Sequence, residues 1–380
     1  NKISGILNGT TNYILTTMES ENKSFDEVLS DAKTSLNEDS ISFIFVGDIM
    51  GHMPFINAAF VDSLNLYDFR PVFSKVAPFF KSVDFTIGNL ELTFGGKPYS
   101  GYPKFSSPDE LAFSCKKSGI NVLMTANNHS CDRGRKGLLR TLDVLDSAKI
   151  NHTGTFKDSF DRNQNNLLIL EKKNIRVGVL NYTYGTNGLP VPKGTMVNII
   201  DTILIKEDIL RSKEEKIDKL IVFLHWGRQY KSHPSKSQKN IADFLHKNGA
   251  DIVIGSHPHV IQKMEYKKGL NHKNEKLVVY SLGNFISNQR EVSRDGGLMV
   301  KITIRKRDNL TSILKPSYYL TWVNKFRNKR GNNYEILPCF MYEKNSIKMS
   351  KKAQSKMSRF IKNSRALLNK ENISFVEQLN

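Results

Sequence analysis

Short apolar runs alternate with helical patterns along most of this chain. The runs have the length of buried strands and lie at residues 41–46, 85–87, 122–125, 167–170, 177–180, 220–224, 252–254, 277–280 and 298–304. Helical patterns occur at 138–148 and 237–248, and in the second Ile241, Phe244 and Leu245 share one face before Gly249 ends the helix. This alternation predicts a layered α/β domain.

The two ends of the chain differ from this pattern. Residues 1–40 contain one helical run, at 25–32, and share no motif with the rest of the chain. Residues 315–340 predict additional edge strands or a cover, and residues 346–370 predict a basic amphipathic helix. We therefore divide the chain into a non-domain N-terminal segment (1–40), one domain (41–340) and a basic helical tail (341–380).

The positive charge is concentrated near the C-terminus. The formal net charge is +19, and residues 301–380 carry 18 Lys and Arg against 5 Asp and Glu, which is +13 of it. Such a surface attracts nucleic acid, anionic lipid or an acidic polymer, and the alternative is a helix face that is merely solvated. No nucleic-acid-binding motif accompanies the charge, so nucleic acid is not the expected partner.

Cysteine content and hydropathy limit the possible classes further. Three cysteines are too few for a disulfide framework or a cysteine-type zinc site, and they leave the redox compartment open. No run approaches the roughly 20 apolar residues of a membrane span. The given sequence also shows no signal-peptide pattern at its N-terminus.

A polar motif comes directly after five of the apolar runs. These motifs contain Asp48, then Asn89 and Glu91, then Asn127, Asn128 and His129, then His225, and finally His257 and His259. Open α/β sheets bind ligands at the carboxyl ends of their strands. Carboxylate, amide and imidazole groups at one such edge predict a metal site, whereas a single Asp at a strand end is more often a turn or a helix cap.

Together the motifs resemble the CapA family of capsule synthesis proteins (poly-γ-glutamate biosynthesis type), a branch of the calcineurin-like metallophosphoesterases. The resemblance rests on GDIM at 47–50, NLE at 89–91, ANNHSCDRG at 126–134, HWG at 225–227, GADIVIGSHPHVIQ at 249–262 and YSLGNF at 280–285. It implies a layered α/β/β/α metallophosphoesterase-like sandwich over about 41–340, with a basic helical C-terminal extension. It also implies an extracytoplasmic protein of the cell envelope.

A dinuclear hydrolase needs carboxylate, amide and imidazole ligands for two divalent ions. The expected metal ligands are Asp48, Glu91, Asn128, His225, His257 and His259. These ligand types suit Mn, Fe or Zn. Two ions about 3.5–4 Å apart can generate a bridging hydroxide at neutral pH. Asn127 is the alternative ligand if the turn is shifted by one residue.

The resemblance also implies the catalytic residues. By analogy with the Asn-His pair of the superfamily, His129 is the expected general acid, and Asp132 either orients it or caps the following helix. The superfamily's His two residues after the first Asp is replaced by Met50, and His52 is a candidate substitute. Gln229 stands where the family usually has Glu, which puts substrate choice in doubt.

The expected function is a metal-dependent hydrolase or transferase in the biosynthesis of a capsule or polyglutamate-type exopolymer. Its expected partners are an acidic polymer or phosphoester substrate and a membrane-associated biosynthesis complex. The alternative is a non-catalytic envelope assembly partner that retains the fold. Residues 1–33 resemble an internal fragment of homoserine dehydrogenases, but the chain has no G-x-G-x-x-G motif, so we do not expect dehydrogenase activity.

Overall fold

The computed structural model describes residues 39–269, 275–307, 310–328 and 331–380, together with 16, 18 and 23–28. Most of the predicted N-terminal segment 1–40 therefore lies outside the described residues. Of the helical run predicted at 25–32, residues 25–28 are helical.

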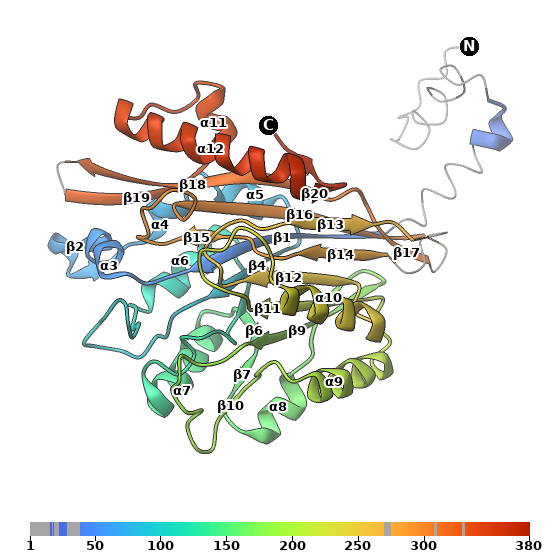
Figure 1. Cartoon of the computed structure of the whole chain (residues 1–380), viewed down its shortest axis with the longest axis horizontal. Coiled ribbons are helices and arrows are strands. Elements are labelled where there is room, and N and C mark those ends of the chain that lie inside the picture. Colours follow the sequence, from blue (N-terminus) through green and yellow to red (C-terminus); the bar gives the residue numbers. More distant parts are fainter. Residues whose placement is uncertain are drawn as a thin grey trace, which may run out of the picture.

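Two β-sheets form the centre of the fold (Figure 1). The first has the order β19-β18-β16-β1-β4-β5-β6, parallel from β1 to β6 and antiparallel from β1 to β19. Its strands are β1 (Asp39–Ile49), β4 (Phe85–Leu90), β5 (Val122–Met124), β6 (Asn151–Thr153), β16 (Gly296–Arg307), β18 (Ser317–Asn328) and β19 (Gly331–Pro338). Three further strands pair outside this order, namely β15 (Asn284–Ile286), β17 (Leu310–Ile313) and β21 (Val376–Glu377).

The second sheet has the order β20-β13-β14-β12-β11-β9-β8 and is parallel from β9 to β14. Its strands are β8 (Leu168–Lys172), β9 (Ile175–Thr183), β11 (Lys219–His225), β12 (Ile252–Ser256), β13 (Met264–Lys267), β14 (Lys276–Val279) and β20 (Asn372–Ile373). Two short ribbons pair β2 (Phe60–Val61) with β3 (Leu66–Tyr67) and β7 (Thr155–Phe156) with β10 (Met196–Val197).

Helices cover the outer faces of both sheets. The first sheet is covered by α3 (Met53–Ala59), α4 (Arg70–Phe73), α5 (Ala77–Lys81), α6 (Glu110–Ser118) and α7 (Gly134–Ser147), and the exposed 3-10 helix η1 (Asp62–Leu64) follows β2. The second is covered by α9 (Thr202–Glu214) and α10 (Lys236–Asn248), with α8 (Ser159–Asn165) beside them. These layers confirm the predicted α/β/β/α sandwich.

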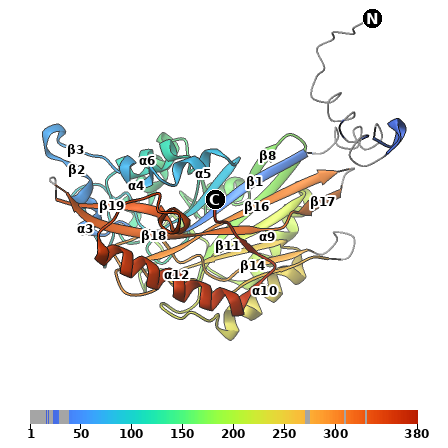
Figure 2. The same ribbon diagram turned by 90° about the horizontal axis from the view of Figure 1, so that it is seen from above.

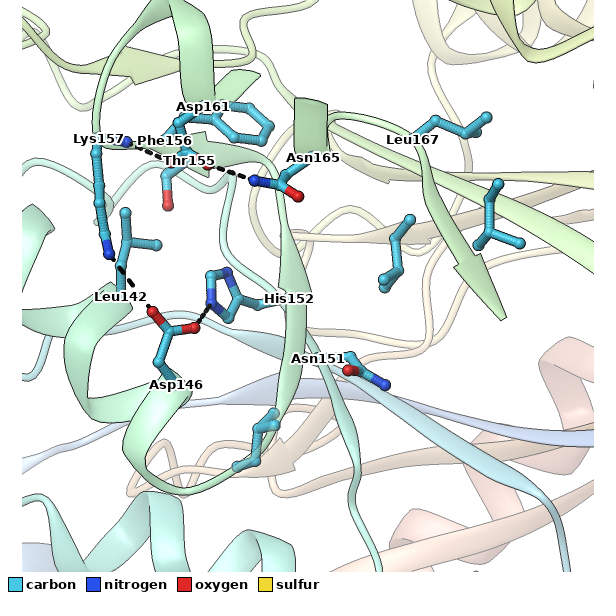
Figure 3. A pocket seen from close by; sticks show the side chains of 13 residues that line it. Leu142, Asp146, Asn151, His152, Thr155, Phe156, Lys157, Asp161, Asn165 and Leu167 are labelled. Atoms are coloured by element: carbon cyan, nitrogen blue, oxygen red, sulfur yellow. Dashed lines mark hydrogen bonds and ion pairs between the residues drawn. The ribbon is translucent and has the colours of Figure 1, made fainter. Parts of the chain in front are cut away.

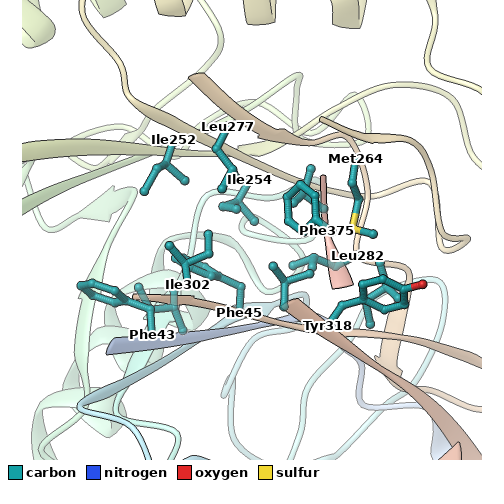
Figure 4. Packing of buried hydrophobic residues seen from close by; sticks show 14 of the residues in the cluster. Phe43, Phe45, Ile252, Ile254, Met264, Leu277, Leu282, Ile302, Tyr318 and Phe375 are labelled. Carbon is teal, nitrogen blue, oxygen red and sulfur yellow. The ribbon is translucent and has the colours of Figure 1, made fainter. Parts of the chain in front are cut away.

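The main hydrophobic core lies between the two sheets (Figure 4). Strand β1 shows how the sequence builds it, because successive side chains of a strand point to opposite faces. Phe43 and Phe45 face the second sheet, and Ile44 and Val46 face the helices. Strands buried on both faces read as continuous apolar runs, which is why β1 was recognisable from sequence.

The C-terminal segment closes one end of the sandwich. After α11 (Cys339–Glu343), helix α12 (Lys351–Glu371) runs along β18 (Figure 2). Its side chains Met357, Phe360, Ile361 and Leu368 are buried in the main core. The chain then adds β20 to the second sheet and β21 to the first. Helix α12 corresponds to the basic helix predicted at 346–370 and begins after Ser350, whose side chain accepts a hydrogen bond from the Ala353 amide.

Candidate metal centre

The predicted ligands meet at the edge where parallel strands of both sheets end. Asp48 lies in β1, Glu91 follows β4, and the loop carrying Asn128 follows β5 in the first sheet. His225 ends β11, and the segment with His257 and His259 follows β12 in the second. The structure therefore brings all six predicted ligands to one place, although their binding of metal stays a prediction.

Glu91 is at the centre of this cluster. Ligand atoms of Asp48, Glu91 and His225 lie within 4.8 Å of one another, and so do those of Glu91, His257 and His259. Glu91 Oε1 is 3.6 Å from His225 Nε2 and 3.7 Å from His259 Nε2. Because Glu91 belongs to both groups, it is placed to bridge two ions.

The hydrogen bonding of Glu91 fits that role. Its side chain is fully buried, and neither carboxylate oxygen has a hydrogen-bond partner. Burial, and then the charge of the Asp48 carboxylate, raise the pKa of Glu91 well above its usual value. An unpartnered buried carboxylate is costly unless a cation pairs with it. The residues present therefore fit a divalent metal pair.

Asp48 is held by three side chains. Asn89 Nδ2 donates to Asp48 Oδ1 at 2.8 Å, the Ser256 hydroxyl donates to the same oxygen, and His259 Nδ1 lies 2.9 Å from Oδ2. Burial alone would raise the pKa of Asp48, but the hydrogen bonds from His259, Ser256 and Asn89 outweigh it and lower the pKa. Asp48 is therefore ionised and available as a ligand.

Asn284 helps to fix the proton of His259. Its Nδ2 donates to the Arg294 carbonyl at 2.7 Å, so its Oδ1, 3.1 Å from His259 Nδ1, is an acceptor. Asp48 is also an acceptor, so Nδ1 of His259 must carry the hydrogen. The lone pair of Nε2 then faces Glu91, which suits a metal ligand.

The other two imidazoles of the cluster are kept neutral. Burial, and then the charges of neighbouring histidines, lower the pKa of His225 well below its usual value. Burial, and then the charge of His259, lower the pKa of His257 to about 3. Histidine binds metal in its neutral form, so neither ring has to lose a proton at pH 7.

The structure distinguishes the two asparagines that the sequence left open. Asn127 Nδ2 donates to the carbonyls of Leu90 and Thr125, and its Oδ1 accepts from the His129 amide. Asn128 Oδ1 instead lies 2.9 Å from His225 Nε2. Asn127 thus shapes the loop, and Asn128 is the amide that faces the cluster.

Asp132 orients His129. Its Oδ2 lies 2.7 Å from His129 Nδ1 and accepts the Phe105 amide at 2.7 Å, and the rings of His129 and Phe105 are 4.6 Å apart. Helix α7 has no side-chain cap at its N-terminus, so Asp132 does not cap it. Because Asp132 holds Nδ1, the other ring nitrogen, Nε2, is left to meet a substrate.

A pocket of about 440 Å³ lies beside the cluster. Asn128, His129, Asp132 and His257 form part of its wall, and the remaining lining residues are Tyr102, Pro103, Lys104, Tyr184, Asn187, Leu189 and Gln229. No pattern in the sequence pointed to Tyr184, whose ring lies 4.6 Å from that of His257. Ser256 could have been found, since it directly precedes His257 in a motif already singled out.

The structure also shows the surroundings of His52 and Trp226. His52 Nδ1 accepts the Asn288 amide at 3.3 Å, and burial, then the charges of His259 and His129, lower the pKa of His52 to about 4. His52 is not in either group of candidate ligands found among the described residues. Trp226 is buried and donates to the Tyr280 carbonyl, so it is a packing residue.

A second pocket of about 450 Å³ lies between the edge strands β6 and β8 (Figure 3). His152 lines it, is half-buried, and has Nε2 3.0 Å from Asp146 Oδ1. Lys157 lies 3.5 Å from the same carboxylate. The polar side chains of this pocket thus largely pair with one another.

Metal binding is expected to release a proton from Glu91. The imidazoles of His225 and His257 are already neutral, whereas the raised pKa of Glu91 favours its protonated form. Metal affinity should therefore rise with pH and level off once Glu91 is ionised in the metal-free protein. Calorimetric titration with Mn²⁺ in buffers of different ionisation enthalpy measures the release. If the Glu91→Gln variant released as many protons on binding Mn²⁺ as the wild type does, Glu91 would not be their source.

Comparison with known proteins gives matches in two parts of the chain. The sequence profile of the bacterial capsule synthesis protein PGA_cap family matches residues 42–289, and that of homoserine dehydrogenase matches residues 1–39. Capsule biosynthesis protein CapA of Bacillus anthracis is 30% identical over 305 residues, which cover 76% of this chain and 69% of that protein. PGA biosynthesis protein CapA of Bacillus subtilis is 25% identical over 282 residues, covering 71% and 69%.

A solved structure supports the fold. A Staphylococcus aureus protein described as a 5′-nucleotidase superposes with a TM-score of 0.50 at 14% identity, covering 85% of this chain and 58% of that one. The layered α/β/β/α arrangement is therefore shared with a solved structure of very different sequence. Among the described residues, no helix combines the length and apolar character needed to cross a bilayer.

Proposed function

This chain belongs to the bacterial capsule synthesis protein family, and on that basis we propose that it is a metal-dependent hydrolase or transferase that makes or trims a capsule or polyglutamate-type exopolymer. The observation that carries the catalytic part of the proposal is Glu91, a buried carboxylate with two unpartnered oxygens among the imidazoles of the cluster. Burying such a group as a carboxylate is costly unless a cation pairs with it.

The proposed ligands are Asp48, Glu91, Asn128, His225, His257 and His259. Two bound Mn, Fe or Zn ions would act as Lewis acids and bring the pKa of a water molecule near neutrality. Asn89 and Ser256 hold the Asp48 carboxylate in place, and Asn284 fixes the tautomer of His259. Tyr184 lines the pocket and packs beside His257.

His129 is the proposed general acid. Asp132 keeps a hydrogen on Nδ1, so that Nε2 delivers a proton to the leaving group of a phosphoester or an amide. The Phe105 ring packs against the imidazole and limits its rotation. Asp132 is a positioning residue, since its contacts are with His129 and the Phe105 amide.

We further propose that the substrate is an acidic polymer or a phosphoester and that the protein works in a membrane-associated biosynthesis complex. We place it at the cell envelope, on the extracytoplasmic side; the capsule biosynthesis relatives support the association with the envelope. The alternative, a non-catalytic assembly partner, is favoured by two observations. Met50 provides no imidazole where the resemblance to the wider metallophosphoesterase superfamily implies one, and Gln229 provides no carboxylate where the resemblance to the CapA family implies one.

An activity screen after metal loading tests the proposal. The protein is loaded with Mn²⁺ and assayed on bis(p-nitrophenyl) phosphate, on p-nitrophenyl phosphate and on poly-γ-glutamate. We expect turnover of at least one substrate, lost on chelation and restored by Mn²⁺. If the protein binds two ions but turns over none of the three substrates, the result would instead favour a non-catalytic assembly partner.

A further inference from the structure

The loop after β9 reaches the metal centre at Asn187. It begins where the Tyr184 amide donates to the His225 carbonyl at 2.9 Å, and it turns at Asn187 and Gly188, whose φ angles are 52° and 74°. Glycine adopts this left-handed region freely, and asparagine does so more readily than most other residues. Asn187 then lies in the wall of the pocket, beside the predicted ligand Asn128.

Asn187 is hydrogen-bonded to the amide of Asn128. Asn128 Nδ2 donates to Asn187 Oδ1 at 3.1 Å, and the Tyr184 hydroxyl donates to the same oxygen at 3.4 Å. Asn128 is buried, with 1% of its surface exposed, whereas Asn187 is exposed. An exposed residue of the pocket wall is therefore bonded directly to a buried candidate ligand.

The direction of the Asn128 amide decides whether this side chain can bind metal. An amide oxygen has lone pairs for a cation, whereas an amide nitrogen presents hydrogens. Because Nδ2 donates to Asn187, Oδ1 lies on the side of His225, 2.9 Å from its Nε2. If the amide were turned over, Nδ2 would face the candidate ligand atoms and Asn128 could not coordinate an ion. The bond to Asn187 favours the orientation that can.

We propose that Asn187 is a positioning residue of the metal centre, which holds the amide oxygen of Asn128 toward the ion that His225 binds. The inference rests on the proposed function and adds a residue outside the proposed ligands on which one of the two metal positions depends. Partners of this kind orient a ligand without touching the ion, and their loss typically weakens metal binding about 10- to 100-fold. Because Asn187 is exposed, water can replace part of its hydrogen bonding, and we expect the lower end of this range.

Replacing Asn187 by Gly tests this inference, because glycine fits the positive φ and removes the side chain. In calorimetric titration with Mn²⁺, the wild type is expected to bind two ions, and Asn187→Gly is expected to bind one of them about tenfold more weakly. The matched control is Asn65→Gly, which makes the same change at an exposed asparagine that follows η1 and has a φ of 48°. The control should bind both ions with wild-type affinity, and the two metal-free variants should have the same Tm.

A second background separates the orientation of the amide from a general effect of the loop. In Asn128→Asp, either side-chain oxygen can face the ion, so that the choice of orientation no longer matters. We therefore expect Asn187→Gly to weaken Mn²⁺ binding in the wild-type background and to leave it unchanged in the Asn128→Asp background. This non-additivity is what a direct contact between the two residues predicts.

Four outcomes would overturn the inference. They are wild-type Mn²⁺ affinity in Asn187→Gly, an equal loss in Asn65→Gly, an equal loss in the Asn128→Asp background, and a lower Tm for metal-free Asn187→Gly than for metal-free Asn65→Gly. The last would show that the side chain supports the loop itself. In all four cases the wild type still binds two ions, and the proposed function is unaffected. A wild type that binds no Mn²⁺ would refute the proposed function together with this inference.

Discussion

Replacing His257 and His259 together by Ala is expected to abolish metal binding. The wild-type chain, loaded with Mn²⁺, should hold about two ions, and the double variant close to none. His259 forms a group of candidate ligand atoms with His257 and Glu91, and it also bonds to Asp48, so its loss disturbs both parts of the cluster. Elemental analysis of the purified proteins gives the metal content directly.

A thermal readout makes the same prediction measurable in a second way. A metal that binds the folded state at about a hundred times its Kd stabilises it by about 2.7 kcal/mol. Mn²⁺ should therefore raise the Tm of the wild type by several degrees and leave that of the double variant unchanged. The matched control is His152→Ala/His233→Ala, because these histidines pair with Asp146 and Glu371 outside the cluster. Equal metal content in both double variants would refute the ligand assignment.

The strands of this fold were largely predictable because most of them are buried on both faces. Each apolar run singled out in the sequence overlaps a strand of one of the two sheets. Strand β6 was missed, since its sequence Asn-His-Thr carries no apolar signal and it pairs at the edge of its sheet. Such strands depend on a neighbour's hydrogen bonds, which a local pattern does not contain.

The sequence predicted which types of side chain form the site and which strand ends carry them. Parallel strands carry their carboxyl ends to one edge, so Asp48 and His225, which are far apart in sequence, were expected to meet there. The choice between Asn127 and Asn128 was not predictable. It depends on the carbonyls of Leu90 and Thr125, and Leu90 belongs to a different strand. A contact made across strands leaves no trace in the spacing of the motif itself.

The position of α12 in the fold could not be predicted from the sequence either. Its amphipathic pattern indicated a helix, but not that its apolar face fills the space between the two sheets. That position depends on β20 and β21, which attach the chain to both sheets after the helix ends. A helix anchored in this way holds its cations in a fixed array on the surface.

Replacing His129 by Ala is expected to lower kcat by about 10²–10⁴-fold while the metal content stays at the wild-type value. His129 lies in the wall of the pocket but outside both groups of candidate ligands found among the described residues. Its loss should therefore remove the proton donor without releasing the ions. The measurement is steady-state turnover of the substrate found in the activity screen, together with elemental analysis of the same sample.

The Asp132→Asn variant separates proton donation from a structural role. Asp132 accepts from both the His129 ring and the Phe105 amide, so Asn keeps the shape but weakens the hold on the imidazole tautomer. We expect a smaller loss of kcat than in His129→Ala and a changed pH profile. A substrate with a leaving group that needs no protonation should largely rescue both variants. If the two variants turn over such a substrate as poorly as substrates whose leaving group needs a proton, His129 does not donate the proton. The effect of its loss must then come from binding or from the fold.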